Sequence, residues 1–356
     1  MKVAFIVRST IHSVPGGDTV QVVQTCRHLN ELGVVAEVKL SNETIDYGGY
    51  DLLHFFNLTR PADMLYHSKK AKKPYVISTI LINYSEYDKY YRKGGKAIFG
   101  FLSADNIEYL KTVARCTLGR DHLSSISYLW KGQHRSIMEI LRRAALILPN
   151  SESEYKRVAQ TYPLPVKYNV VPNGIDPKRF VYNPFEKKDE KLVLCVARIE
   201  GIKNQLNLIK ALNNTDYKLL LIGSHSPSQG DYYKECVSIA GGNIHFIDHL
   251  PQESLVSYYR QAKVHILPSW FETTGLSSIE AAAMGCNIVI TDRGDAKEYF
   301  RNDAFYCDPA SPESLLSAVE KASSTPNNPR LMDKILKNYT WKQAAIQTLK
   351  AYQSVI

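Results

Sequence analysis

Two carboxylates, Glu272 and Glu280, flank a predicted helix start in the second half of this 356-residue chain. Glu272 lies in a loop that ends at Gly275, and Glu280 lies about a turn and a half inside the helix, so the two are on the order of 10 Å apart. Gly285 ends the helix, and Asn287–Ile290 has the pattern of a buried strand. Free N–H groups at the helix start favour an anion. The arrangement suits a ligand with two hydroxylated rings joined by a diphosphate, such as a nucleotide sugar.

The same stretch also admits a purely structural interpretation. Ser277 and Glu280 match the capping-box pattern, in which Glu280 would only satisfy backbone groups at the helix end. Glu272 would then be an ordinary solvated acid in a loop. The residues around the two acids favour the functional interpretation.

Residues 268–292, PSWFETTGLSSIEAAAMGCNIVITD, resemble the signature of the retaining family 4 glycosyltransferases, which have the GT-B fold. The resemblance implies that Glu272 contacts the transferred sugar and that Glu280 holds the donor ribose. It implies further donor contacts from Thr274, Gly275 and Leu276. The chain departs from the family at Thr273 and Thr274, where glycine and an aromatic residue are common, and this difference predicts an altered sugar pocket.

Two cations are expected at the same ligand. Residues 197–205, ARIEGIKNQ, follow a predicted strand and resemble the family segment in which an arginine and a lysine bind the donor diphosphate; here these are Arg198 and Lys203. Fixed positive charges stabilise the charge that develops on a leaving diphosphate. Without the resemblance, two solvated cations at a helix start would be expected. The family turn that contacts the nucleobase corresponds to residues 248–250, which include His249.

The first half of the chain is expected to contact the acceptor. Gly16 and Gly17 resemble the family's glycine loop over the active site, where glycine lets the backbone approach a phosphate or acceptor. A plain tight turn is the alternative. His54 resembles a histidine that is common after a family strand, and a hydrogen-bonded core histidine is its alternative.

One family feature is missing from the acceptor side. Where the family often has Thr-x-His, this chain has Thr79, Ile80 and Leu81. The candidates to take the place of that histidine are Asn83, Tyr84 and Glu86. The histidine role could equally be absent from this chain.

Composition narrows the class of protein. An apolar content of 44% can support real cores, and the length suits two domains of Rossmann size. The longest apolar runs fall short of the about 18 residues of a membrane span. Six scattered cysteines without a CxxC motif fit a reducing compartment, so we expect a cytoplasmic protein. Because there is no Asp-x-Asp motif and no histidine pair at metal-ligand spacing, we expect neither a metal nor another cofactor.

The net charge of +9 is unevenly distributed. Residues 1–172 hold 23 Lys and Arg against 15 Asp and Glu, whereas residues 173–356 hold 21 against 20. A basic first half suggests an anionic partner, such as a membrane surface, a pyrophosphate lipid or nucleic acid, or else a merely soluble basic surface. The segment 89–102 combines basic and apolar residues, which suits reversible docking at an anionic membrane or a core helix with a solvated end. No nucleic-acid-binding motif is present, so no nucleic acid is expected.

Alternating strand and helix patterns predict an α/β chain. We expect strands at 2–7, 34–40, 51–55, 75–79, 146–148, 167–171, 192–197, 217–222, 244–247, 264–267 and 287–290. The resemblance implies a GT-B fold with two Rossmann-like domains facing across a cleft. The acceptor-side domain would be residues 1–172 completed by a C-terminal helix at 340–356, and the nucleotide-sugar domain residues 173–339. We interpret 172–180 as the hinge and 186–191 as the solvated end of the linker.

The sequence therefore predicts a retaining glycosyltransferase that moves a sugar from a nucleotide sugar to a hydroxyl acceptor. The acceptor would be a saccharide or a lipid-linked saccharide, in cell-envelope glycan synthesis at the inner face of a membrane. Two other classes stay open. One is an epimerase or phosphorylase that uses the same fold, and the other is a catalytically silent binding partner.

Overall fold

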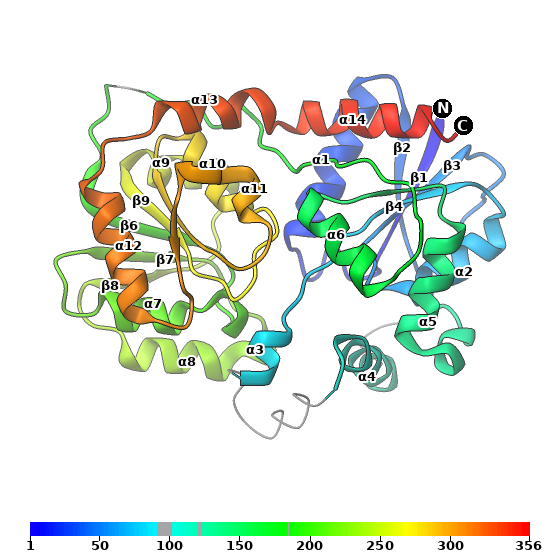
Figure 1. The fold of residues 1–356 in the computed structure, drawn as a ribbon, viewed down its shortest axis with the longest axis horizontal. Helices are drawn as coiled ribbons and strands as arrows, with labels where there is room; N and C mark the ends of the chain where they lie inside the picture. Colours follow the sequence, from blue (N-terminus) through cyan, green and yellow to red (C-terminus); the bar gives the residue numbers. More distant parts are fainter. Residues whose placement is uncertain (91–101, 120–122, 184) are drawn as a thin grey trace. The chain divides into compact units, whose positions relative to one another are not determined.

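The computed structural model describes residues 1–90, 102–119, 123–183 and 185–356. The chain forms two compact units (Figure 1). Unit 1 comprises Met1–Asn173 and Trp341–Ile356, and unit 2 comprises Gly174–Thr340. The division lies one residue from the boundary expected after residue 172. Most of the basic and apolar segment 89–102 lies outside the described residues.

Unit 1 contains a five-stranded parallel sheet in the order β2-β1-β3-β4-β5. Its strands are β1 (Lys2–Val7), β2 (Val35–Leu40), β3 (Leu52–Phe56), β4 (Tyr75–Ser78) and β5 (Leu146–Leu148). The central strands are buried on both faces, which explains why they read as nearly continuous apolar runs.

Helices cover both faces of this sheet. They are α1 (Gly17–Glu31), α2 (Pro61–Ala71), α5 (Ser127–Arg143), α6 (Glu152–Thr161) and α14 (Trp341–Gln353). Unit 1 also contains α3 (Ser85–Tyr90) and α4 (Ala104–Thr117), and α4 packs on α5. Side chains of α2, α5 and α6 form one apolar core with β1, β3 and β4. On the opposite face α14 lies alongside α1 and contacts β3 through Tyr352 (Figure 1). The C-terminal helix therefore completes the core of unit 1.

Unit 2 contains a six-stranded parallel sheet in the order β11-β10-β9-β6-β7-β8. Its strands are β6 (Asp189–Val196), β7 (Lys218–Ile222), β8 (Ile244–Ile247), β9 (Ala262–Leu267), β10 (Asn287–Thr291) and β11 (Phe305–Cys307). The order changes direction at β6, where the chain first builds outwards to β8 and then returns to β9. Ligands of open parallel sheets bind at the carboxyl ends of the strands beside such a point.

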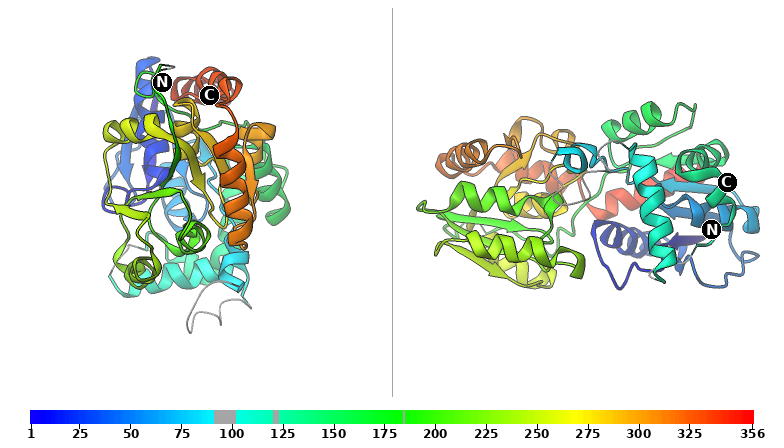
Figure 2. Two further views of the ribbon diagram at one scale, coloured as in Figure 1. Left: turned by 90° about the vertical axis from the view of Figure 1, so that its left-hand side faces the viewer. Right: turned by 90° about the horizontal axis from the view of Figure 1, so that it is seen from below.

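Two layers of helices enclose the sheet of unit 2 (Figure 2). The helices are α7 (Gln205–Leu212), α8 (Gly230–Ile239), α9 (Gln252–Gln261), α10 (Leu276–Ala283), α11 (Ala296–Phe300), α12 (Pro312–Ser324) and α13 (Pro329–Asn338). Helices α9, α10, α11 and α13 pack on one face, and α7, α8 and α12 pack on the other. Alternate residues of each strand point into the two cores.

Two sequence expectations differ from the structure. Residues 167–171 form only an isolated bridge, between Ile147 and Tyr168, because nearby prolines interrupt the ladder. The charged run 186–191 is not all linker, since β6 already begins at Asp189. Lys188 explains this early start: its ammonium group donates to the carbonyls of Tyr259 and Ala262 at 2.8 and 3.1 Å and so ties the run to α9 and β9.

Across the described ranges, no helix has both the length and the apolar character required to cross a membrane.

Candidate active site

The candidate donor-binding residues follow the carboxyl ends of neighbouring strands in unit 2. Arg198 lies two residues after β6, and the loop that carries Glu272 follows β9, which pairs directly with β6. β10 lies on the other side of β9 and ends just before Asp292. Because parallel strands bring their carboxyl ends to one edge, three loops distant in sequence meet there.

Lys203 and Glu272 form an ion pair at this edge. The Lys203 Nζ atom lies 2.8 Å from Glu272 Oε2, and both side chains are largely shielded from solvent. The sequence predicted that both residues act on the same donor, and the structure brings them into direct contact. The pair places a positive and a negative group beside the start of α10.

Asn204 fixes the position of Lys203, and sequence analysis missed it. Its backbone is left-handed, with φ 62°, between a short 3₁₀ turn at Gly201–Lys203 and α7. Its buried amide donates to the carbonyls of Pro268 and Pro309 at 3.1 and 2.7 Å. Asparagine tolerates this backbone conformation better than most residues. Helix α7 therefore starts at Gln205, two residues after Lys203.

Gly294 allows the backbone of Glu272 to pack closely against it, and sequence analysis missed this residue too. Glu272 N donates to the carbonyl of Arg293 at 3.2 Å, and Asp295 N donates to the carbonyl of Glu272 at 2.8 Å. Gly294 has φ 98°, and a Cβ atom there would lie 2.2 Å from the Glu272 carbonyl oxygen. Only glycine fits at this approach. A glycine soon after the predicted strand 287–290 was the available signal.

Arg198 is the more exposed of the two predicted cations. Its guanidinium lies 2.9 Å from a carboxylate oxygen of Glu200, with 44% of the Arg198 side chain exposed. Its backbone is fixed by Gln205, whose side-chain amide donates to the Arg198 carbonyl at 2.9 Å. An exposed guanidinium on a fixed backbone can reach an anionic ligand at this edge.

Gly275 shapes the start of α10. It has φ 69°, and a Cβ atom there would lie 3.0 Å from Ile290 Cδ1. Leu276 is the first residue of the helix, where backbone N–H groups have no intrahelical acceptor. Thr274 is buried, and its hydroxyl donates to Tyr299 OH at 3.2 Å. This stretch therefore offers backbone donors at Leu276, whereas the Thr274 side chain packs inwards.

Glu280 is buried and does not form the capping box that its spacing allowed. Gln252 Nε2 and Tyr259 OH donate to its two carboxylate oxygens at 2.8 and 3.0 Å. Burial raises the pKa of Glu280 to about 7, although these two hydrogen bonds and the charge of Arg179 favour the ionised form. The side chain thus points towards α9 and carries a carboxylate that is tuned to titrate near neutral pH.

His249 lies in the loop between β8 and α9. Its side chain is exposed, and its backbone N–H donates to Asp248 Oδ1 at 2.7 Å. Three residues later Gln252 begins α9 and contacts Glu280. The predicted nucleobase turn and the predicted ribose carboxylate are therefore linked through one residue.

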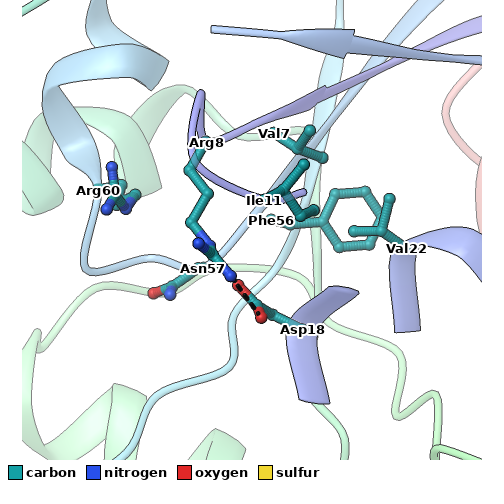
Figure 3. Close-up of a pocket in the computed structure, with 8 residues that line it drawn as sticks. All are labelled: Val7, Arg8, Ile11, Asp18, Val22, Phe56, Asn57 and Arg60. Carbon is teal, nitrogen blue, oxygen red and sulfur yellow. Dashed lines mark hydrogen bonds and ion pairs between the residues drawn. The ribbon is translucent and has the colours of Figure 1, made fainter. Parts of the chain in front are cut away.

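In unit 1, Arg8 holds the predicted glycine loop (Figure 3). Arg8 Nε donates to Asp18 Oδ2 at 2.7 Å, and Arg8 NH2 donates to Asp18 Oδ1 at 3.1 Å and to the Val14 carbonyl at 2.7 Å. Gly16 is the N-cap of α1, and Gly17 is its first residue. The loop is therefore tied at both ends by one guanidinium, a contact that sequence analysis did not anticipate.

A pocket lies beside this loop at the carboxyl ends of β1 and β3 (Figure 3). It is lined by Val7, Arg8, Ile11, Asp18, Val22, Phe56, Asn57 and Arg60. The lining combines two guanidinium groups and an amide with an apolar wall.

His54 is a fully enclosed core residue, as its alternative interpretation stated. Its Nδ1 atom lies 2.6 Å from Tyr352 OH and its Nε2 atom 2.9 Å from Ser78 Oγ, and only 1% of the residue is exposed. Burial lowers the pKa of His54 to about 3, so the ring is neutral at physiological pH. Both nitrogens are occupied in joining β3 to β4 and α14.

Asn83, Tyr84 and Glu86 follow β4 in unit 1. Asn83 is exposed and accepts the Ser85 N–H at 3.0 Å, which starts α3, while Tyr84 and Glu86 are half-buried. Just before them, the buried Glu154 accepts the Leu81 N–H at 2.8 Å, and Ile80 takes an unusual φ of 45°. A β-branched residue in this conformation marks a constrained loop.

The part of the chain that the structure describes holds no group of three or more His, Cys, Asp or Glu residues that could bind a metal ion. Arg198 and Lys203 supply positive charge at the donor edge.

Comparisons with known proteins match part of unit 2 to a glycosyltransferase family. The family model "Glycosyl transferases group 1" matches residues 178–339, which lie within unit 2. A curated glycosyltransferase of Methanocaldococcus jannaschii, itself uncharacterised, is 26% identical over 214 residues, which are 52% of this chain and 54% of the relative. The chain spans about half the length of the curated relatives it matches. Residues 178–339 therefore resemble the group 1 glycosyltransferases.

Solved structures share the fold over nearly the whole chain. Sucrose-phosphate synthase from Thermosynechococcus elongatus has a TM-score of 0.74 at 16% identity, with 99% of this chain and 98% of that chain covered. Anabaena HepE in complex with UDP has a TM-score of 0.72 at 15% identity, with 99% and 100% covered. The predicted fold, two Rossmann-like domains of the GT-B class, is confirmed.

Proposed function

Since the chain matches the group 1 glycosyltransferases, we propose that it is a retaining enzyme of family 4 that transfers a sugar from a nucleotide sugar to a hydroxyl acceptor. One observation carries this proposal: Lys203 and Glu272 meet at the start of α10, and the buried Glu280 lies inside the same helix. Positive charge, backbone donors and two carboxylates are the groups that a diphosphate flanked by two hydroxylated rings requires.

Each part of the donor has a partner in this proposal. The ribose hydroxyls donate to Glu280, whose neighbour Gln252 begins the helix after the nucleobase turn at His249. The diphosphate is bound by Arg198, Lys203 and the N–H groups at Leu276. Glu272 accepts hydrogen bonds from the sugar hydroxyls. A lysine ammonium has three donors, so Lys203 can bind Glu272 and a phosphate oxygen together.

The reaction needs no side-chain nucleophile. The acceptor hydroxyl attacks the anomeric carbon from the face that the diphosphate leaves, and the bond between that carbon and the phosphate oxygen breaks. The hydroxyl proton passes to an oxygen of the leaving diphosphate. Lys203 and Arg198 stabilise the charge that grows on the diphosphate, and attack on the leaving-group face retains the anomeric configuration.

We further propose that the reaction proceeds without a metal ion, because two cationic side chains already supply the charge that a metal would provide. Activity is then expected to survive excess chelator after dialysis. Activity that is lost with chelator and restored by a divalent metal would contradict this part of the proposal.

UDP-sugars are the first donors to test, because HepE binds UDP. A ligand that binds the folded chain raises its melting temperature, so thermal-shift measurements against nucleoside diphosphates and nucleotide sugars identify the base and the sugar. Absence of a shift with every nucleotide would contradict the proposal. The matched control is Glu280→Ala, in which the shift for the true donor is expected to shrink.

For the acceptor we propose a saccharide carried on a lipid, in cell-envelope glycan synthesis, with the enzyme in the cytoplasm at the inner face of the membrane. The excess positive charge of residues 1–172 supports this acceptor class. These residues lie in unit 1, which we propose binds the acceptor.

A further inference from the structure

Large apolar side chains are exposed together on one part of unit 1. Of the described residues, six large hydrophobic ones between positions 102 and 130 are exposed, more than any other stretch of similar length shows. Trp130 is 83% exposed, Ile126 72% and Leu118 65%. Monomeric proteins seldom leave such groups clustered in water without a partner.

Helical spacing places these side chains on two faces. In α4 the exposed Leu110, Ala114 and Leu118 are spaced four residues apart, and Ile107 is the buried residue of that helix. Ile126 and Trp130, also four apart, lie at the start of α5, before the kink at Gly132. Residues four apart share one side of a helix.

The two faces belong to adjacent elements. Tyr109 OH donates to the Leu129 carbonyl at 3.0 Å, and the rings of Tyr109 and Tyr128 are 5.4 Å apart. Further along, His134 Nδ1 lies 2.8 Å from Asp105 Oδ2. The start of α5 therefore runs beside α4. We name the exposed set Leu110, Leu118, Ile126, Leu129 and Trp130 the apolar docking face.

The segment that carries the apolar docking face has an excess of positive charge. The described residues between 102 and 143 include six Lys and Arg but three Asp and Glu. Asp105 and Glu108 contact His134 and Lys111, and Glu139 is shared by Lys69, Lys131 and Arg143. In these ranges neither Arg115 nor Arg135 has an ion-pair partner, and basic residues outnumber acidic ones by three, so net positive charge remains.

We propose that the apolar docking face inserts into the headgroup region of a bilayer that contains anionic lipids. Tryptophan and aliphatic side chains beside cations are the composition that binds this interface. A second copy of the chain is a poorer occupant, because a two-fold interface would bring two positive faces together. This face would carry out the membrane association that is part of the proposed function. Docking itself does not depend on the transfer reaction.

Tryptophan fluorescence gives a direct test, because the other two tryptophans, Trp270 and Trp341, are buried. Phosphatidylcholine vesicles with and without phosphatidylglycerol are added to the full chain. We expect a blue shift of Trp130 emission with the anionic vesicles that weakens in high salt. An unchanged spectrum together with failure to cosediment would overturn the proposal.

Variants distinguish membrane binding through the apolar docking face from nonspecific binding by exposed apolar side chains. Leu118→Ser with Ile126→Ser is expected to raise the lipid concentration for half-maximal binding at least about fivefold, and Arg115→Gln with Arg135→Gln to remove most of the salt dependence. The control is Val181→Ser with Phe185→Ser, which removes two exposed apolar side chains of unit 2. Equal loss in the control and the docking variants would contradict the proposal.

Two further readouts keep the conclusions separate. The docking variants should bind the nucleotide as the unchanged chain does, since the donor residues lie in unit 2. Loss of nucleotide binding would show that these variants misfold. In that case Trp130→Ser, assayed by cosedimentation, replaces the double variants. A concentration-dependent dimer that Ile126→Ser abolishes would identify the face as an interface between copies and overturn membrane docking. Vesicle binding without nucleotide binding would contradict the proposed function alone.

Discussion

Lys203 Nζ and Glu272 Oε2 lie 2.8 Å apart although the residues are 69 positions apart in the chain. The contact joins the loop after β6 to the loop after β9, so the sheet order itself creates it. Removal of either residue would break this ion pair in a site with little solvent access. The pair is therefore a unit, and its two members have to be tested separately and together.

The first prediction concerns the cations. Lys203→Ala and Arg198→Ala should each lower kcat by about 10²-fold or more, because charge that stabilises the transition state is lost. Steady-state kinetics with the identified donor measure this effect. Lys337→Ala, an exposed lysine on α13, is the control and should leave kcat unchanged. Ordinary kinetics in both active-site variants would refute the assignment.

The second prediction separates the two carboxylates. Glu280→Ala should mainly weaken binding of the nucleoside diphosphate, since the ribose contact acts in ground and transition states alike. Glu272→Ala should lower turnover but leave nucleoside-diphosphate binding largely intact. Calorimetry with the free nucleotide distinguishes the two. If Glu272→Ala abolished binding and Glu280→Ala did not, the two roles would be reversed.

The third prediction follows from the raised pKa of Glu280. The pKa rises from 4.5 to about 7 on folding, so between these pH values the native state binds a proton that the unfolded chain has released. The free energy of unfolding therefore falls as pH rises through this window, by up to about 3 kcal/mol, and is level above it. Glu280→Gln, which cannot titrate, should remove this slope.

Urea denaturation of both proteins at a series of pH values tests that prediction. The informative quantity is the difference between the two unfolding free energies, because other groups that titrate at acid pH contribute equally to both. A difference that stays constant from acid to neutral pH would mean that folding leaves the pKa of Glu280 unchanged.

The fourth prediction concerns Gly294. An added Cβ would press on the Glu272 carbonyl, so Gly294→Ala should displace Glu272 and lower turnover at least about tenfold, with a smaller effect on nucleotide binding. Gly242→Ala is the matched control, since a Cβ there meets nothing within 4 Å. Equal turnover in both variants would show that the loop of Glu272 tolerates the shift.

The order of strands and helices could be predicted because strands such as β1 and β9 are apolar throughout and their helices have a clear apolar face. That Glu272 and Lys203 lie near each other could be predicted because both stand in local motifs with fixed spacing. Asn204 and Gly294 could not, because their roles depend on contacts with Pro309 and Glu272, which the sheet brings near from elsewhere in the chain.

The sequence also could not predict how deeply individual polar side chains are buried. His54 and Glu280 are both polar residues in apolar surroundings, and their spacing fitted either a site or a structural role. The structure encloses both, but His54 has each nitrogen bonded within unit 1, whereas Glu280 lies beside the helix start that Lys203 and Glu272 share. The difference lies in their neighbours, which no local pattern encodes.

The most direct test of the account is the anomeric configuration of the product. The purified chain is incubated with the nucleotide sugar found by thermal shift and with an acceptor saccharide, and the new glycosidic bond is followed by proton NMR. The account predicts an acceptor-bound sugar with the anomeric configuration of the donor, and its loss in Glu272→Ala. An inverted product, or an altered or hydrolysed nucleotide sugar with no glycosylated acceptor, would contradict it.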